Sequence, residues 1–143
     1  MRKPAMIGLV ALLLAAQPAL AADEPLVVIV HLDRRAELTR EDVAQIYLRR
    51  QRFWPDATVV APLNLRAGDP LREQFTRQVL RRTAPRLADH WNRQYLDGVL
   101  PPATLASSAA VLRFVAAERN AIGYVPRSAV DGSVRILLTL PPP

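Results

Sequence analysis

The residues best suited to chemistry in this sequence lie where a predicted strand runs into a predicted helix. Arg66 and Arg72 supply guanidinium donors, and Gly68-Asp69-Pro70 is typical of a helix start. Asp69 can cap the helix, and Pro70 suits the first helical position because no amide is needed there. The first turn of a helix is electropositive and attracts oxyanions. Arg66, Gly68, Asp69 and Arg72 are therefore a candidate oxyanion site.

A second group combines basic and aromatic side chains and consists of Arg49, Arg50, Arg52, Phe53 and Trp54. Exposed Arg and Trp side chains anchor many protein interfaces, so Arg49, Arg50, Arg52 and Trp54 are a candidate interaction surface. The alternative is that the two aromatic rings fold back onto the core while the arginines stay in solvent.

Other residue types give little sign of catalysis. The two histidines, His31 and His90, are far apart and lack metal-ligand spacing, and no serine lies in a GxSxG context. No close pair of carboxylates suggests acid–base work. The absence of cysteine excludes disulfides, thiolate metal sites and cysteine nucleophiles. We therefore expect a protein that is not an enzyme, with no cofactor and no metal.

Residues 1–21 have the pattern of a signal peptide. A basic Arg2-Lys3 start precedes an apolar run over 5–16, and Ala19-Leu20-Ala21 supplies the small residues of a cleavage site. The apolar run is shorter than the roughly 20 residues that cross a bilayer. We expect cleavage to leave 22–143 as a single periplasmic domain that does not span the membrane.

The chain carries a formal net charge of +6, and all its basic side chains except Lys3 are arginines. A basic surface attracts anions in general. Because export argues against nucleic acid as the natural partner, the expected partners are an inorganic oxyanion or a periplasmic or membrane protein.

Hydrophobic patterns and capping residues predict the elements that must position these side chains. Strands are expected at 26–31, 58–64, 121–125 and 134–140, and helices from 39, from 70 to about 80, from 85 to about 97, and from about 108 to 118. Strands that alternate with helices imply an α/β fold with helices packed on a mixed sheet.

The helix expected from 85 to about 97 shows a clear apolar face. Thr83 and Pro85 predict its start, and Gly98 predicts its end. Leu87, Trp91 and Tyr95 are spaced by four residues and lie on one side. We expect this side to pack into the core.

Four segments, taken in order, resemble the phosphate ABC transporter substrate-binding proteins. They are Ile46-Tyr47-Leu48, Phe53-Trp54-Pro55-Asp56, the stretch 64–75 and Ala121-Ile122-Gly123-Tyr124-Val125. The resemblance covers about 26–140 and implies one lobe of the type 2 periplasmic-binding-protein fold. Full members of that family hold the ligand between two such lobes. The present chain is too short for two, so the resemblance implies a single-lobe relative.

The resemblance weakens where the family binds its anion. The family has an arginine, three residues, and then Ser-Gly-Thr before the helix. If Arg72-Glu73-Gln74-Phe75 sets the register, the arginine falls on Leu65, and Ser-Gly-Thr falls on Asp69-Pro70-Leu71. No hydroxyl remains, proline lacks an amide, and Asp69 is expected to cap the helix in place of the ligand. Arg66 is one residue away and is expected on the opposite face of the strand.

Two hypotheses follow. The first is an exported, non-enzymatic binding-protein-like domain that has lost the family's phosphate ligation and interacts with a protein partner, with itself or with another small ligand. The second is a solute-binding component that binds phosphate or another oxyanion for transport, with dimerisation completing the cleft.

Overall fold

The fold is organised around a buried strand, β1 (Leu26–His31), in a computed structural model that describes residues 24–143. All residues from Leu26 to Val30 are fully buried. The strand pairs antiparallel with β4 on one side and with β5 on the other. The continuous apolar run is therefore explained by a central position covered on both faces. The predicted signal peptide, 1–21, lies outside the described residues.

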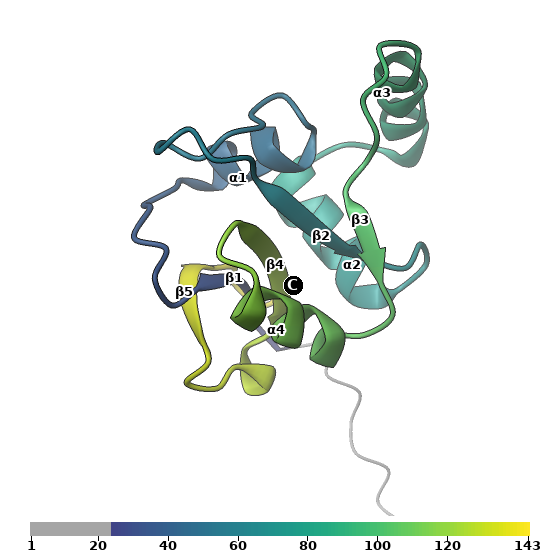
Figure 1. Ribbon diagram of the computed structural model, residues 1–143. Coiled ribbons are helices and arrows are strands. Elements are labelled where there is room, and N and C mark those ends of the chain that lie inside the picture. Colours follow the sequence, from purple (N-terminus) through teal and green to yellow (C-terminus); the bar gives the residue numbers. More distant parts are fainter. Residues whose placement is uncertain (1–23) are drawn as a thin grey trace, which may run out of the picture.

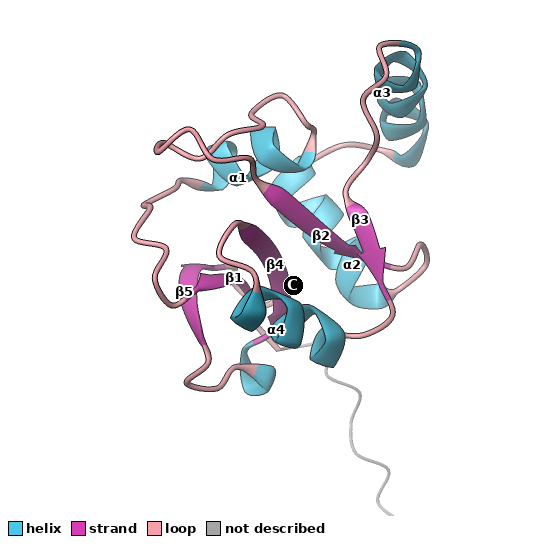
Figure 2. Cartoon of the chain, viewed as in Figure 1, coloured by secondary structure: helices cyan, strands magenta, loops and turns pink. Residues whose placement is uncertain are grey.

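The sheet is mixed, as predicted, and has the strand order β3-β2-β4-β1-β5 (Figures 1 and 2). β2 lies parallel to both β3 and β4, while β4 lies antiparallel to β1. The remaining strands are β2 (Ala61–Leu65), β3 (Ala103–Leu105), β4 (Ala121–Pro126) and β5 (Val134–Thr139).

Helices cover both faces of this sheet, and one of the helices stands apart from it. They are α1 (Arg40–Tyr47), α2 (Pro70–Phe75), α3 (Ala84–Leu96) and α4 (Ser108–Ala117), with a π-helical turn η1 (Thr76–Leu80) after α2 and a 3-10 turn η2 (Arg127–Ala129) after β4. Every helix within 24–143 is too short or too polar to cross a membrane.

Two neighbouring residues of β4 show how the helices divide between the faces. Gly123 lies against Val111 of α4. The ring of Tyr124 lies 6.0 Å from that of Tyr47 in α1 and stacks on Phe75 of α2 at 4.1 Å. Because successive strand residues point to opposite faces, α4 covers one face while α1 and α2 cover the other.

The predicted helix starts are confirmed at three positions. Thr39 and Asp42 form a reciprocal capping box at α1. Asp69 caps α2 with Pro70 at the first helical position, and Ser107 caps α4. These caps use side chains within three residues of the amides they satisfy, which is why sequence patterns could indicate them.

The second strand differs from its prediction. Residues 58–60 do not belong to β2, because they pair back on the preceding loop: the Trp54 amide donates to the Thr58 carbonyl at 2.8 Å and the Val60 amide to the Arg52 carbonyl at 2.9 Å. The β-branched residues 58–60 form one side of a small hairpin around the Pro55-Asp56 turn. The short edge strand β3 follows the prolines at 101–102 and was not predicted.

The core position predicted for the apolar side of α3 is wrong. Tyr95 is 70% exposed, and Leu87 and Trp91 are half-buried, whereas the buried side chain of the helix is His90. α3 stands at the edge of the molecule, apart from the sheet (Figure 1). A helical period shows that one side is apolar, but it does not show what covers that side.

Gly123 offers a test of the packing between α4 and the sheet. A Cβ atom at this position would lie 2.5 Å from Val111 Cγ1 and 3.4 Å from Val115 Cγ2. Both neighbours are β-branched and cannot easily rotate away. We expect Gly123→Ala to lower the free energy of unfolding by about 1–3 kcal/mol in urea denaturation. Gly132→Ala, with no atom within 4 Å, is the control. Equal stability of the two variants would contradict the packing.

Candidate functional site

The predicted oxyanion site lies at the junction of β2 and α2, where several of its donors are already used. Asp69 Oδ1 accepts the Leu71 amide at 2.9 Å, and the Asp69 carbonyl accepts the Glu73 amide at 3.0 Å. Pro70 has no amide to give. A carboxylate of the chain thus occupies the place at the start of α2 where an anion would be held.

The two arginines of the predicted site do not converge. Arg72 Nη1 donates to the Leu65 carbonyl at 2.9 Å, which ties the guanidinium to the end of β2. Arg66 is exposed next to the buried Leu65, as expected from strand alternation. Gly68 has a φ of +84°, so it turns the chain between the strand and the helix in a conformation that favours glycine.

Two further residues fill this junction and were not identified from the sequence. The Tyr124 hydroxyl donates to Asn64 Oδ1 and accepts from the Leu65 amide at 3.3 Å. Burial raises the pKa of Tyr124, so its hydroxyl stays protonated. The Leu65 amide also donates to Asn64 Oδ1, at 3.1 Å. The strand-end amide that could face an anion is therefore already taken.

Some residues of the candidate interaction surface are buried and others are exposed. Trp54 is only 2% exposed and donates from Nε1 to the Asn120 carbonyl at 3.0 Å, so its prediction as a surface anchor is wrong. Its ring packs inward because the loop folds back on the sheet. Phe53 is 53% exposed, and Arg50 and Arg52 are exposed.

Arg49 lies between surface and interior. Its Nε is buried without a hydrogen-bond partner among the described residues, and its Nη1 lies 3.5 Å from the Val60 carbonyl. Burial, followed by the charge of Arg52, lowers the pKa of Arg49. Arg49 also has a φ of +60°, an uncommon conformation for a residue with a Cβ.

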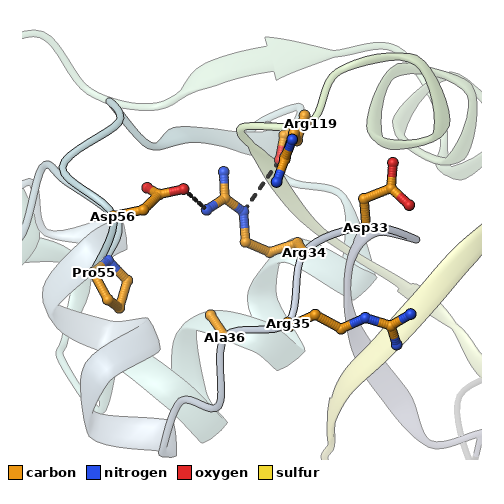
Figure 3. Close-up of a pocket in the computed structure, with 7 residues that line it drawn as sticks. All are labelled: Asp33, Arg34, Arg35, Ala36, Pro55, Asp56 and Arg119. Carbon is orange, nitrogen blue, oxygen red and sulfur yellow. Dashed lines mark hydrogen bonds and ion pairs between the residues drawn. The ribbon is translucent and has the colours of Figure 1, made fainter.

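A hollow of about 330 Å³ surrounds Arg34, which was not identified from the sequence. Arg34 is 5% exposed, and its guanidinium lies between Asp56 and the backbone carbonyl of Arg119 (Figure 3). Nη1 donates to Asp56 Oδ2 at 2.9 Å, and Nη2 donates to Asn120 Oδ1 at 2.6 Å. All three guanidinium nitrogens donate hydrogen bonds within the protein. Arg34 therefore connects the 55–58 turn to the start of β4 and does not offer free donors to an anion in the hollow.

The same contacts of Arg34 hold Trp54 and the 55–58 turn in place. Arg34 Cζ lies 4.4 Å from the centroid of the Trp54 ring, a cation–π arrangement. The Thr58 hydroxyl and amide, with a smaller contribution from Arg34, lower the pKa of Asp56 to about 2. Asp56 therefore stays ionised at any ordinary pH.

The histidines remain apart in the fold. His31 Nδ1 accepts the Asp33 amide at 3.1 Å at the end of β1, while the buried His90 Nε2 lies 2.9 Å from the Leu48 carbonyl. The described part of the chain contains no group of three or more His, Asp or Glu side chains that could hold a metal ion.

Acid titration tests the contacts of Asp56 with Thr58 and Arg34. The pKa of Asp56 is about 2 in the folded chain and near 3.8 when unperturbed. Its stabilisation is therefore complete above about pH 4 and is lost as the pH falls towards 2. We expect Asp56→Asn to lower the urea midpoint at pH 7 and to flatten the further loss between pH 4 and 2. Glu37→Gln, at an exposed site, is the control. The same acid profile in Asp56→Asn and wild type would contradict this assignment.

No protein-family model and no curated protein matches the sequence. Solved structures do match. An ABC-type phosphate transport receptor from Vibrio cholerae superposes with a TM-score of 0.64 at 20% identity, over 80% of this chain and 45% of that one. A second match is a protein from Clostridium perfringens described as a phosphate ABC transporter substrate-binding protein and solved with bound phosphate. It superposes with a TM-score of 0.66 at 21% identity, over 80% of this chain and 44% of that one.

PstS from Borrelia burgdorferi gives a TM-score of 0.62 at 13% identity, over 80% of this chain and 46% of that one. The chain thus spans less than half the length of these three proteins. At such identities the likeness concerns the fold, and it confirms the architecture that the sequence resemblance implied. The chain has the α/β fold of one part of phosphate-type substrate-binding proteins.

Proposed function

We propose that this chain is an exported, non-enzymatic binding domain in which the anion ligation of the phosphate-binding proteins has been lost. The observation that carries the proposal is the Asp69 carboxylate on the first turn of α2. The signal-peptide pattern of 1–21 supports export to the periplasm, and 22–143 would form the mature domain.

Electrostatics supports the loss of ligation. A carboxylate 4 Å from a singly charged oxyanion repels it by about 4 kcal/mol near a protein surface, which weakens binding roughly a thousandfold. Arg72 Nη1 donates to the Leu65 carbonyl, which holds this guanidinium at the end of β2. The chain spans less than half the length of the similar structures, so an anion held by this part alone would stay largely hydrated.

The alternative is a solute-binding component that holds phosphate or another oxyanion for transport. The protein of similar fold solved with bound phosphate favours this reading. It requires Arg66 and Arg72 to turn towards a common ligand, with a second copy closing the cleft. The two functions therefore differ in what these arginines do.

Calorimetric titration with phosphate separates the two functions. We expect no saturable binding at the β2–α2 junction up to millimolar phosphate. Asp69→Asn keeps an N-cap but removes the charge, so any weak binding at the junction should strengthen. Micromolar binding by the wild type that is lost in Arg66→Ala or Arg72→Ala would establish the alternative and overturn the proposal.

Exposed apolar side chains at the end of α3 support a protein partner. Tyr95 is 70% exposed, Leu96 85% and Leu100 64%. Neighbouring apolar side chains left in solvent are typical of interaction surfaces.

Pull-down from a periplasmic extract tests this contact. We expect the wild-type chain to retain a partner that Leu96→Glu loses, because a carboxylate would have to be desolvated in the interface. Leu32→Glu, at an exposed leucine beyond β1, is the control. Equal capture by both variants would mean that the end of α3 is not the contact.

A further inference from the structure

A second hollow of about 330 Å³ lies between α1, η1 and the start of α3. Four arginines line it, namely Arg50, Arg81, Arg82 and Arg86, and Glu41 is the one acidic residue in its lining. We propose that this arginine pocket binds a small polyvalent anion, a compact molecule that carries two or three phosphate or carboxylate groups. The pocket shares no residue with the β2–α2 junction.

The arginines of the pocket lack the carboxylate partners that such a cluster would need. Within residues 24–143, Arg34 is the only arginine that lies within 4.0 Å of a carboxylate oxygen. Glu41 accepts instead from Gln45 Nε2 at 2.5 Å. Four cations therefore face one carboxylate that is already hydrogen-bonded. A polyvalent anion would relieve their mutual repulsion.

The backbone places these charges together at a conformational cost. The π-helical turn η1 ends at Arg81, whose amide donates to the Thr76 carbonyl at 2.9 Å. Arg81 has a φ of +50°, in the left-handed region that residues with a Cβ rarely adopt. π-helical turns and such strained residues are frequent at functional sites. In this chain the π-helical turn and the left-handed Arg81 place two consecutive arginines, Arg81 and Arg82, in the lining of one pocket.

The positive charge of the pocket lowers the pKa of a buried neighbouring histidine. His90 of α3 is 3% exposed and lies with Nε2 2.9 Å from the carbonyl of Leu48, which also lines the pocket. Burial is the main cause that lowers the pKa of His90, and the charges of Arg50, Arg82 and Arg93 lower it further, while the hydrogen bond to Leu48 opposes them. The field that disfavours a proton on His90 attracts an anion to the pocket.

The geometry indicates the class of ligand. A volume of about 330 Å³ lies at the low end for small-molecule sites. Guanidinium groups bind phosphate and carboxylate through paired hydrogen bonds, so several arginines suit several oxyanion groups. The buried side chains of Ala44, Leu48 and Val79 form an apolar part of the lining that can accept a carbon linker.

Calorimetric titration of the full mature chain with pyrophosphate and with citrate tests the proposal. We expect saturable binding that weakens about tenfold or more in Arg82→Ala and in Arg86→Ala, since each removes a charge-assisted hydrogen bond. Arg113→Ala removes the same charge from an exposed position on α4 and should leave binding unchanged. Glu41→Gln removes the acidic residue and should tighten it. The stronger of the two probes identifies the phosphate or the carboxylate source.

Four outcomes would overturn the proposal. The first is an absence of saturable binding of both probes to wild type and Glu41→Gln. The second is an equal loss in Arg113→Ala, which would show a general charge effect. The third is binding of an acidic peptide alone, which would make the pocket a protein contact. Loss of binding in Arg66→Ala but not in Arg82→Ala would place the anion at the β2–α2 junction and contradict the proposed function as well.

Discussion

The buried charge of Arg34 is the constraint on which the hairpin loop and the start of β4 depend. A guanidinium removed from water must find partners, and Arg34 finds them 22, 24 and 86 residues along the chain, in Asp56, Thr58 and Asn120. These partners hold the hairpin loop against the start of β4. Trp54 is enclosed beneath the guanidinium, and Arg50 and Arg52 are left at the surface.

Arginine has two opposite roles in this chain. Arg34 and Arg72 donate to carboxylate, amide or carbonyl oxygens of the protein itself, so their charges are used to hold the fold. The arginine pocket has no ion pair within the described residues, and its charges remain available to a ligand. At the β2–α2 junction the Asp69 carboxylate caps α2 and Arg72 donates to the Leu65 carbonyl, whereas the arginines of the pocket have no carboxylate partner among the described residues.

Several local features could be predicted because their causes lie within a few residues. The apolar run of β1, the capping box at Thr39 and the Asp69 cap depend on neighbouring side chains and backbone. The mixed α/β sheet could be inferred from the order of strands and helices and from the resemblance to a known fold.

Other features depend on contacts that no local pattern contains. Trp54 is buried because Arg34 and Asn120 meet it, and Tyr95 is exposed because nothing in the described chain packs on that side of α3. The arginine pocket is lined by Arg50 and by three arginines within 81–86, which lie more than 30 residues further along the sequence. By itself the sequence determined where β1 and the capped helices α1, α2 and α4 begin and which side chains cap these helices. Only the tertiary structure decided that, within residues 24–143, Arg34 pairs with a carboxylate while the arginines of the pocket do not, because pairing of charges depends on distance in space.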